Sequence, residues 1–115
     1  MTDQLRQKLT HFVTLWHENG RARFQRSSPS LDYDTYSPKT FTERRRWVAL
    51  DQGSPTQAGQ CGVFLLDPLT EEVYTIKAYG VPNRKVATLD SLIRDYEAAN
   101  ASQRAFDGRD AAGRP

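Results

Sequence analysis

The sequence predicts an α+β fold, in which a three-stranded antiparallel sheet is flanked by an N-terminal and a C-terminal helix. Apolar residues recur at helical spacing near both ends of the chain, and three short runs of strand-forming residues lie between them. The chain has 115 residues, which is the length of one domain. We place this single domain at residues 1–106, with a long arm at 21–43 and a disordered tail at 107–115.

Residues 3–19 are expected to form the first helix. One face of this segment is apolar and the other carries Gln, Lys, Arg and Thr, as in helices that pack on a core. We expect Gly20 to end the helix in the left-handed conformation. The apolar stripe consists of Leu5, Leu9, Phe12, Val13 and Trp16.

The segment 21–43 is expected to be an arm outside the core. It begins with Arg21–Arg26, which can form a short strand or an extended stretch, and it continues through a run of Ser and Pro at 27–30 that disfavours helix and strand alike. Unstructured segments of this length are unusual inside a compact domain. We therefore expect the arm to be either functional or loosely ordered.

Three strands are expected, at 45–50, 62–66 and 72–79. Trp47 lies in the first strand and is expected in the core. The second strand is apolar from Val63 to Leu66, which is typical of a strand whose two faces are both covered. We therefore expect it at the centre of the sheet, with the N-terminal helix on one face and the C-terminal helix on the other.

Residues 89–104 are expected to form the C-terminal helix. Thr88 can cap its first turn, and the negative charge of Asp90 suits the positive end of the helix dipole. The apolar stripe consists of Leu89, Leu92, Ile93 and Tyr96. From Asp107 onward the chain holds mainly Gly, Ala, Asp and Arg, and we expect this tail to be disordered.

The composition limits the class of protein. Sixteen basic and fourteen acidic residues give a net charge of +2, which is too balanced to indicate nucleic-acid or membrane binding by itself. Cys61 is the single cysteine, so an internal disulfide is excluded and a reducing compartment is expected. The N-terminus lacks the regions of a signal peptide, and no stretch is apolar enough to span a membrane. We expect a cytoplasmic protein without membrane contact.

Residues 62–83 follow a hairpin pattern: an apolar strand, an Asp-x-x-Thr turn, a strand with Tyr and Lys, and a Gly/Pro turn. This stretch resembles a hairpin of many small, mostly uncharacterised bacteriophage proteins, whose turn reads Asp-x-x-Thr-Gly-Asp/Glu. The resemblance implies a phage origin, a location in the host-cell cytoplasm and a small accessory role. The matching residues are Asp67, Thr70, Glu72, Tyr74, Lys77, Gly80 and Pro82.

One position departs from this pattern, because Glu71 stands where the bacteriophage hairpins have Gly. Glycine supplies a positive φ without steric cost. Either Glu71 adopts the same backbone conformation, at a cost of about 1 kcal/mol, or the turn is of another type.

No pattern in the sequence indicates an enzyme. His11 and His17 are six positions apart, which places them on different faces of a helix, so they cannot form an i, i+4 metal pair. Cys61 has no histidine near it in the sequence and is expected to be a small buried residue. We expect no catalytic residues, no metal ligands and no cofactor. A small enzyme is the third possibility, and it would require a cleft that brings together Cys61, a histidine and a carboxylate.

Arginines and aromatic residues provide the candidate binding surfaces. The favoured interpretation is a non-catalytic accessory protein that binds a host or viral protein, or a second copy of itself, through the basic and aromatic arm. Tyr, Trp and Arg are common anchors of protein interfaces. The residues expected at this surface are Arg21, Arg23, Arg26, Tyr33, Tyr36, Arg44 and Arg46.

The alternative interpretation is nucleic-acid binding. Arginines pair with phosphates while neighbouring aromatic rings stack on bases, as in proteins that hold single strands. Such a surface should lose affinity steeply as salt rises, whereas an aromatic protein interface should be far less sensitive. The residues expected at this surface are Arg44, Arg45, Arg46, Lys77, Arg84 and Lys85.

Overall fold

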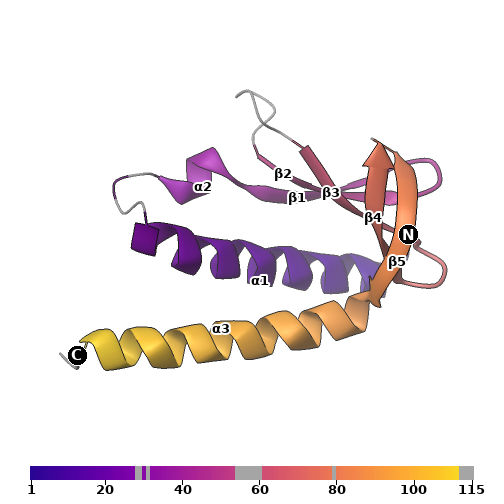
Figure 1. Cartoon of the computed structure of the whole chain (residues 1–115). Helices are drawn as coiled ribbons and strands as arrows, with labels where there is room; N and C mark the ends of the chain where they lie inside the picture. Colours follow the sequence, from indigo (N-terminus) through magenta and orange to yellow (C-terminus); the bar gives the residue numbers. More distant parts are fainter. Residues whose placement is uncertain (28–29, 31, 54–60, 79, 112–115) are drawn as a thin grey trace.

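The computed structural model describes residues 1–27, 30, 32–53, 61–78 and 80–111 (Figure 1). Two long helices frame a meander of strands, and a single-turn helix precedes the first strand. The elements are α1 (Asp3–Ser27), α2 (Tyr33–Tyr36), β1 (Lys39–Glu43), β2 (Val48–Gln52), β3 (Cys61–Leu66), β4 (Glu72–Ala78), β5 (Val81–Thr88) and α3 (Leu89–Ala111).

The sheet formed by the described residues has five antiparallel strands in the order β1-β2-β3-β4-β5, so strands adjacent in sequence are paired. The α+β class, the helices at both ends and the antiparallel sheet are confirmed. The expected number of three strands was wrong, because β1 and β5 were not predicted. β3 lies at the centre of the sheet, as its apolar sequence indicated.

The two strands that were not predicted are the edges of the sheet. β1 has Phe41 as its single large apolar residue. β5 contains Pro82 and Asn83, which on the sequence alone indicate a turn. An edge strand tolerates Pro because one of its sides makes no ladder hydrogen bonds, and charged residues there discourage pairing with other chains. The polar sequences of β1 and β5 therefore follow from their position.

Both long helices lie on the same side of the sheet (Figure 1). α1 contacts β1, and α3 follows β5 directly and runs beside α1. The expectation that the helices cover opposite faces of β3 was therefore wrong. The reason lies in the apolar stripe of α3, which packs on α1 as well as on the sheet: the edge of Tyr96 meets Phe12 at a ring-centroid distance of 5.4 Å.

The core lies between α1 and this side of the sheet. Leu9 and Phe12 of α1 are fully buried and share one cluster with Leu50, Leu66 and Val73 from the three central strands. Burying a side chain of this size contributes about 1.5–3 kcal/mol relative to leaving it exposed. The apolar stripe predicted for the first helix is thus the main support of the sheet.

The prediction that Gly20 ends the first helix was wrong, because α1 continues through it to Ser27. Glycine is needed here for space. A Cβ atom at position 20 would lie 2.8 Å from Cζ of Tyr33, whose ring passes close to this turn of the helix. As a consequence, Arg21–Arg26 are helical rather than a strand or an extended stretch.

The segment expected to be an arm is largely structured where it is described. Its first part belongs to α1, and α2 and β1 form most of its second part. Tyr33 is buried and packs on Phe24 at a ring-centroid distance of 5.2 Å. The buried Lys39 donates hydrogen bonds from Nζ to the Tyr33 hydroxyl (2.6 Å) and the Ser37 carbonyl (2.9 Å). These contacts fold the segment back onto α1.

α3 continues to Ala111, into the stretch from Asp107 where disorder was expected, and residues 112–115 lie outside the described part. Asn100 ties the helix to its neighbour, since its buried amide donates to the Leu15 carbonyl at 3.0 Å. A helix anchored in this way extends readily, because each further residue adds one hydrogen bond. No described helix is both long and apolar enough to cross a membrane.

The β3–β4 turn settles the question raised by Glu71. Its φ is 59°, so it adopts the left-handed conformation that glycine reaches without steric cost. Asp67 begins the turn by accepting a hydrogen bond on Oδ1 from the Leu69 amide at 2.9 Å. Lys8 of α1 pairs with the Glu71 carboxylate at 2.9 Å, a contact that glycine could not make.

Candidate functional site

The side of the sheet opposite the helices carries a second set of buried side chains. Successive residues of a strand point to opposite faces. Val48 of β2 belongs to the core, whereas its neighbour Ala49 is buried on the other side, in register with Leu65 of β3, which in turn pairs with Tyr74 of β4. Among the described residues no helix lies on this side, which we call the helix-free face (Figure 1).

An arginine-rich turn borders the helix-free face. It joins β1 to β2 through Arg44–Trp47 and is closed by a hydrogen bond of 2.8 Å from the Arg44 amide to the Trp47 carbonyl. The three arginine side chains, Arg44–Arg46, are exposed, and we call them the arginine hairpin. The strand expected at 45–50 therefore begins at Val48, after this turn.

Trp47 was expected in the core, but it forms a platform beside the arginine hairpin. The guanidinium carbon of Arg46 lies 4.5 Å from the centre of the Trp47 ring. Trp47 meets Tyr74 in an edge-to-face contact with a centroid distance of 5.4 Å. Such contacts fix the orientation of the rings. Arg46, Trp47 and Tyr74 thus form a row of one cation and two half-buried aromatic rings.

Lys85 extends this row onto β5. It is in register with Tyr74, and its Nζ lies 2.7 Å from a carboxylate oxygen of Glu72. The hydrogen bond and the negative charge of Glu72 raise the pKa of Lys85. Lys85 therefore stays charged at neutral pH, but Glu72 balances much of its charge.

A cavity of about 280 Å³ opens beside the arginine hairpin. It is lined by Ala49, Leu65 and Ile76 from three strands, together with Trp47 and the three arginines. Ligand sites commonly combine apolar walls with a few polar groups. The polar group among the strand residues of this cavity is Asp51.

Asp51 is an unusual buried carboxylate. The residue is 2% exposed, and Oδ1 has no hydrogen-bond partner among the described residues. Burial raises the pKa of Asp51, and the positive charge of Arg44 opposes part of that rise. Buried side-chain oxygens are paired in the large majority of cases. The unpaired oxygen of Asp51, in a residue that lines a cavity, is therefore the strongest sign of a ligand site on this face.

Asp67 shows the ordinary arrangement of a buried carboxylate. It is 8% exposed, but Oδ1 accepts the Leu69 amide and Oδ2 lies 3.7 Å from Nη1 of Arg46. The backbone hydrogen bond from Leu69, with help from the charge of Arg46, lowers the pKa of Asp67. Two buried aspartates, one in β2 and one directly after β3, thus have pKa values shifted in opposite directions.

A second cavity, of about 330 Å³, lies where α2 meets α1. His17 Nε2 and Arg21 Nη2 each lie 2.6 Å from Oδ1 of Asp34, and their hydrogen bonds hold the pKa of Asp34 below its ordinary value. The charges of Arg21 and Asp34 neutralise each other. We therefore interpret it as a fastening of α2 to α1 rather than as a binding site.

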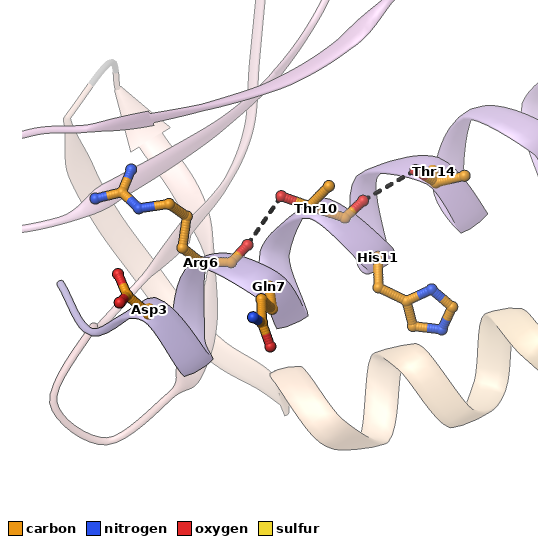
Figure 2. A pocket seen from close by; sticks show the side chains of 6 residues that line it. All are labelled: Asp3, Arg6, Gln7, Thr10, His11 and Thr14. Carbon is orange, nitrogen blue, oxygen red and sulfur yellow. Dashed lines mark hydrogen bonds between the residues drawn. The ribbon is translucent and has the colours of Figure 1, made fainter.

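A wider depression, of about 590 Å³, runs along the exposed face of α1 (Figure 2). Its hydroxyls are used within the helix, since Thr10 donates to the Arg6 carbonyl at 2.9 Å and Thr14 to the Thr10 carbonyl at 3.0 Å. His11 lies 2.8 Å from the Glu97 carboxylate of α3. All six lining residues are exposed and belong to one helix, so this depression lacks the enclosed polar group of a ligand site.

The residues expected at a protein-binding arm do not form one surface. Arg21 and Arg23 belong to the C-terminal half of α1. The arginine hairpin lies near the other end of α1, where Glu43 pairs with the N-terminal amine at 3.4 Å (Figure 1). Tyr33, expected at the surface, is buried, and Arg21 is held by Asp34.

Two members of that expected surface remain exposed near the end of α1. Tyr36 is 60% exposed and stacks on Phe24 at a centroid distance of 5.9 Å, and Arg23 is exposed on the same helix as Phe24. The side chain of Arg26 lies outside the described part of the chain.

The residues expected to bind nucleic acid are brought together in part. The three arginines share one turn, and Lys85 follows them across Trp47 and Tyr74. Lys77 and Arg84 are exposed on β4 and β5. Asp51 was not expected from the sequence, because it was assigned to the loop after the first strand. Its place directly after the apolar residues 48–50 was the available signal.

Within the described residues, no group of three or more His, Cys, Asp or Glu side chains could hold a metal ion. Cys61, expected to be buried, is exposed at the start of β3. No protein-family model matches the chain, and no curated protein or solved structure matches it significantly. The assignment of function therefore depends on the chemistry of the helix-free face.

Proposed function

We propose that this protein is a non-catalytic binding protein that holds single-stranded nucleic acid across the helix-free face, next to the arginine hairpin. One observation carries the proposal: Arg46, Trp47 and Tyr74 form a continuous row, with contacts of 4.5 Å and 5.4 Å, beside a cavity with mainly apolar walls.

This arrangement supplies both kinds of contact that hold a single strand. Arginines neutralise phosphates, and aromatic rings stack on bases. The helix-free face offers three exposed arginines and two rings within one turn and one strand. A duplex suits it less well, because paired bases present their edges in grooves and not their faces to a protein ring.

The local charge, and not the charge of the whole chain, supports this function. The net charge is only +2, so attraction to phosphates must come from the arginine hairpin. Lys85 adds less, because Glu72 lies 2.7 Å away. We therefore expect a modest affinity that depends on a small number of cations.

Fluorescence anisotropy with a labelled oligothymidylate tests the proposal. Between about 50 and 200 mM salt, the logarithm of the binding constant should fall with the logarithm of salt at a slope of about −2, if each of the three arginines neutralises one phosphate. Changing Arg44, Arg45 and Arg46 together to Gln should remove most of the slope.

Arg23→Gln is the matched control, because Arg23 is exposed but lies on the far half of α1. It should leave both the affinity and the slope unchanged. If the unaltered protein binds no oligonucleotide at the low-salt end of this range, the proposed function is wrong.

A protein partner is the second candidate, and one observation favours it: Tyr36 is 60% exposed while its ring stacks on Phe24. Exposed Tyr beside Arg is a common anchor of interfaces. The partner would be a host or viral protein, or a second copy of this chain. Capture from nuclease-treated host lysate that is lost in Tyr36→Ala, together with unchanged oligonucleotide binding, would support this candidate.

The phage origin and the location in the host cytoplasm are part of the same proposal. They rest on the resemblance of residues 62–83 to bacteriophage hairpins, and the positive φ of Glu71 supports a shared turn geometry. Phage genes beside the coding sequence would support this origin, and a position among housekeeping genes of a cellular chromosome would contradict it.

A further inference from the structure

We infer that the cavity beside the arginine hairpin receives one base of the bound strand and favours guanine, with the Asp51 carboxylate accepting hydrogen bonds from the donors on the edge of that base. The inference rests on the proposed function and adds a base preference to it. It accounts for the unpaired buried oxygen, the apolar walls and the ring at the cavity.

The unpaired oxygen defines what the ligand must present. Asp51 is 2% exposed, and Oδ1 has no partner among the described residues. Leaving such a group unpaired destabilises the folded protein unless a ligand pairs with it. An ionised carboxylate accepts hydrogen bonds and donates none. The ligand must therefore bring N–H or O–H groups into the cavity.

The walls and the volume define the shape of the ligand. Ala49, Leu65 and Ile76 offer apolar contacts, and Trp47 offers a ring on which a planar group can stack. The volume of about 280 Å³ lies just below the range of roughly 300–1,000 Å³ that is usual for small-molecule pockets. A single planar ring system suits this space better than a whole nucleotide, whose phosphate would remain outside near Arg45 and Arg46.

The bases differ in the hydrogen-bond donors and acceptors on their edges, and this difference indicates which base suits the cavity. Guanine presents two adjacent donors, N1–H and N2–H, on its Watson–Crick edge, the edge by which proteins read splayed-out bases. Adenine and cytosine each have one amino donor, at N6 or N4, next to an acceptor, at N1 or N3, so they offer the Asp51 carboxylate one hydrogen bond where guanine offers two. Thymine and uracil have one donor between two acceptors. Guanine is thus the base whose edge complements an acceptor with two free lone pairs.

The test compares oligothymidylates that are identical except for one central base, measured by fluorescence anisotropy. Replacing the central thymine with guanine should tighten binding at least about fivefold, the lower end of the discrimination given by a good pair of hydrogen bonds. Adenine or cytosine at that position should give a smaller gain than guanine, because each offers one donor instead of two. Hypoxanthine, which lacks the N2 amino group, should lose part of the gain without any change to the protein.

Asp51→Asn should abolish the preference for guanine, so that oligothymidylates with guanine or thymine at the central position bind with equal affinity. Asp95→Asn on α3 is the matched control, because it makes the same chemical change at an exposed site away from the cavity, and it should keep the preference. Circular dichroism establishes that both variants are folded. The hypoxanthine arm keeps the inference open to refutation even if Asp51→Asn does not fold.

The outcomes separate the two proposals. If no oligonucleotide binds, the proposed function fails and the base preference fails with it. If all oligonucleotides bind equally, the function stands and the guanine pocket is wrong. If guanine is preferred but hypoxanthine binds equally well, the assignment of the N2 donor is overturned. If Asp51→Asn keeps the preference for guanine, the assignment of Asp51 is overturned.

Discussion

The two faces of the sheet are built from alternate residues of the same strands, yet they differ in kind. On the helix side, Val48, Leu66 and Val73 are packed by α1, and this cluster contains no charged residue. On the helix-free face, the small residue Ala49 and the buried Asp51 leave a cavity that side chains do not fill. The comparison indicates that the first face holds the fold together, whereas the second is less tightly packed and is the face that we propose for binding.

The largest expected effect concerns the helix side. Phe12→Ala should lower the free energy of unfolding by about 3–5 kcal/mol, since it removes a fully buried ring that contacts both Trp16 and Tyr96. Urea denaturation followed by circular dichroism measures the loss. Phe12→Leu is the control and should cost less than about 2 kcal/mol. A loss below about 1 kcal/mol in Phe12→Ala would contradict the assignment of Phe12 to the core.

Trp47→Ala should show the reverse pattern on the helix-free face. We expect oligothymidylate affinity to fall roughly tenfold, because stacking of one base on an aromatic ring contributes about 1–3 kcal/mol. Stability should fall by less than in Phe12→Ala, because Trp47 is not part of the core cluster. Trp47→Phe keeps a ring and should retain most of the affinity. Equal losses of affinity in Trp47→Ala and Trp47→Phe would indicate a role other than stacking.

Asp51→Asn should raise the free energy of unfolding at neutral pH by about 1 kcal/mol, because it removes a buried negative charge while keeping one side-chain oxygen. The pKa of Asp51 in the folded protein is raised above its ordinary value of 3.8. Between pH 3.8 and the pKa of the folded state, the folded protein therefore binds more protons than the unfolded chain. This group therefore stabilises the fold below pH 3.8, and its contribution is lost as pH rises through the folded pKa.

Thermal melts across acidic to neutral pH measure this effect, and the difference between Asp51→Asn and the unaltered protein should grow as pH rises. Asp67→Asn is the comparison with the opposite sign, because the pKa of Asp67 is lowered by the Leu69 amide. It should destabilise the protein at neutral pH and much less in acid. If both variants lose stability, the two aspartates do not differ as described.

The smallest expected effect lies at the β3–β4 turn. Glu71→Gly relieves a positive φ that costs about 1 kcal/mol in other residues. It also removes the ion pair with Lys8, so the net gain in unfolding free energy should be smaller than this figure. Glu71→Gln keeps the strain and weakens the pair, and should be slightly destabilising. Denaturant melts at low and high salt separate the two contributions, since salt screens the pair but not the strain.

The candidate site was less predictable than the fold. The arginine hairpin was recognised because its residues are consecutive in sequence. Trp47, Tyr74 and Asp51 come from a turn and two strands that the sheet brings together, and nothing local in the sequence relates them. Tyr33 was expected at the surface, but Gly20 makes room for its ring against α1, and that fit is visible only once both are placed.

The sequence by itself determined the two end helices, the three central strands and the central position of β3, because helical spacing and unbroken apolar runs are local patterns that report burial directly. The tertiary structure alone decided the rest. Strand pairing adds the polar segments β1 and β5 to the sheet as its edge strands. Both helices lie on one side of the sheet because their apolar stripes pack on each other. As a result, no helix of the described residues lies on the other side, and the face that we propose for binding exists for this reason.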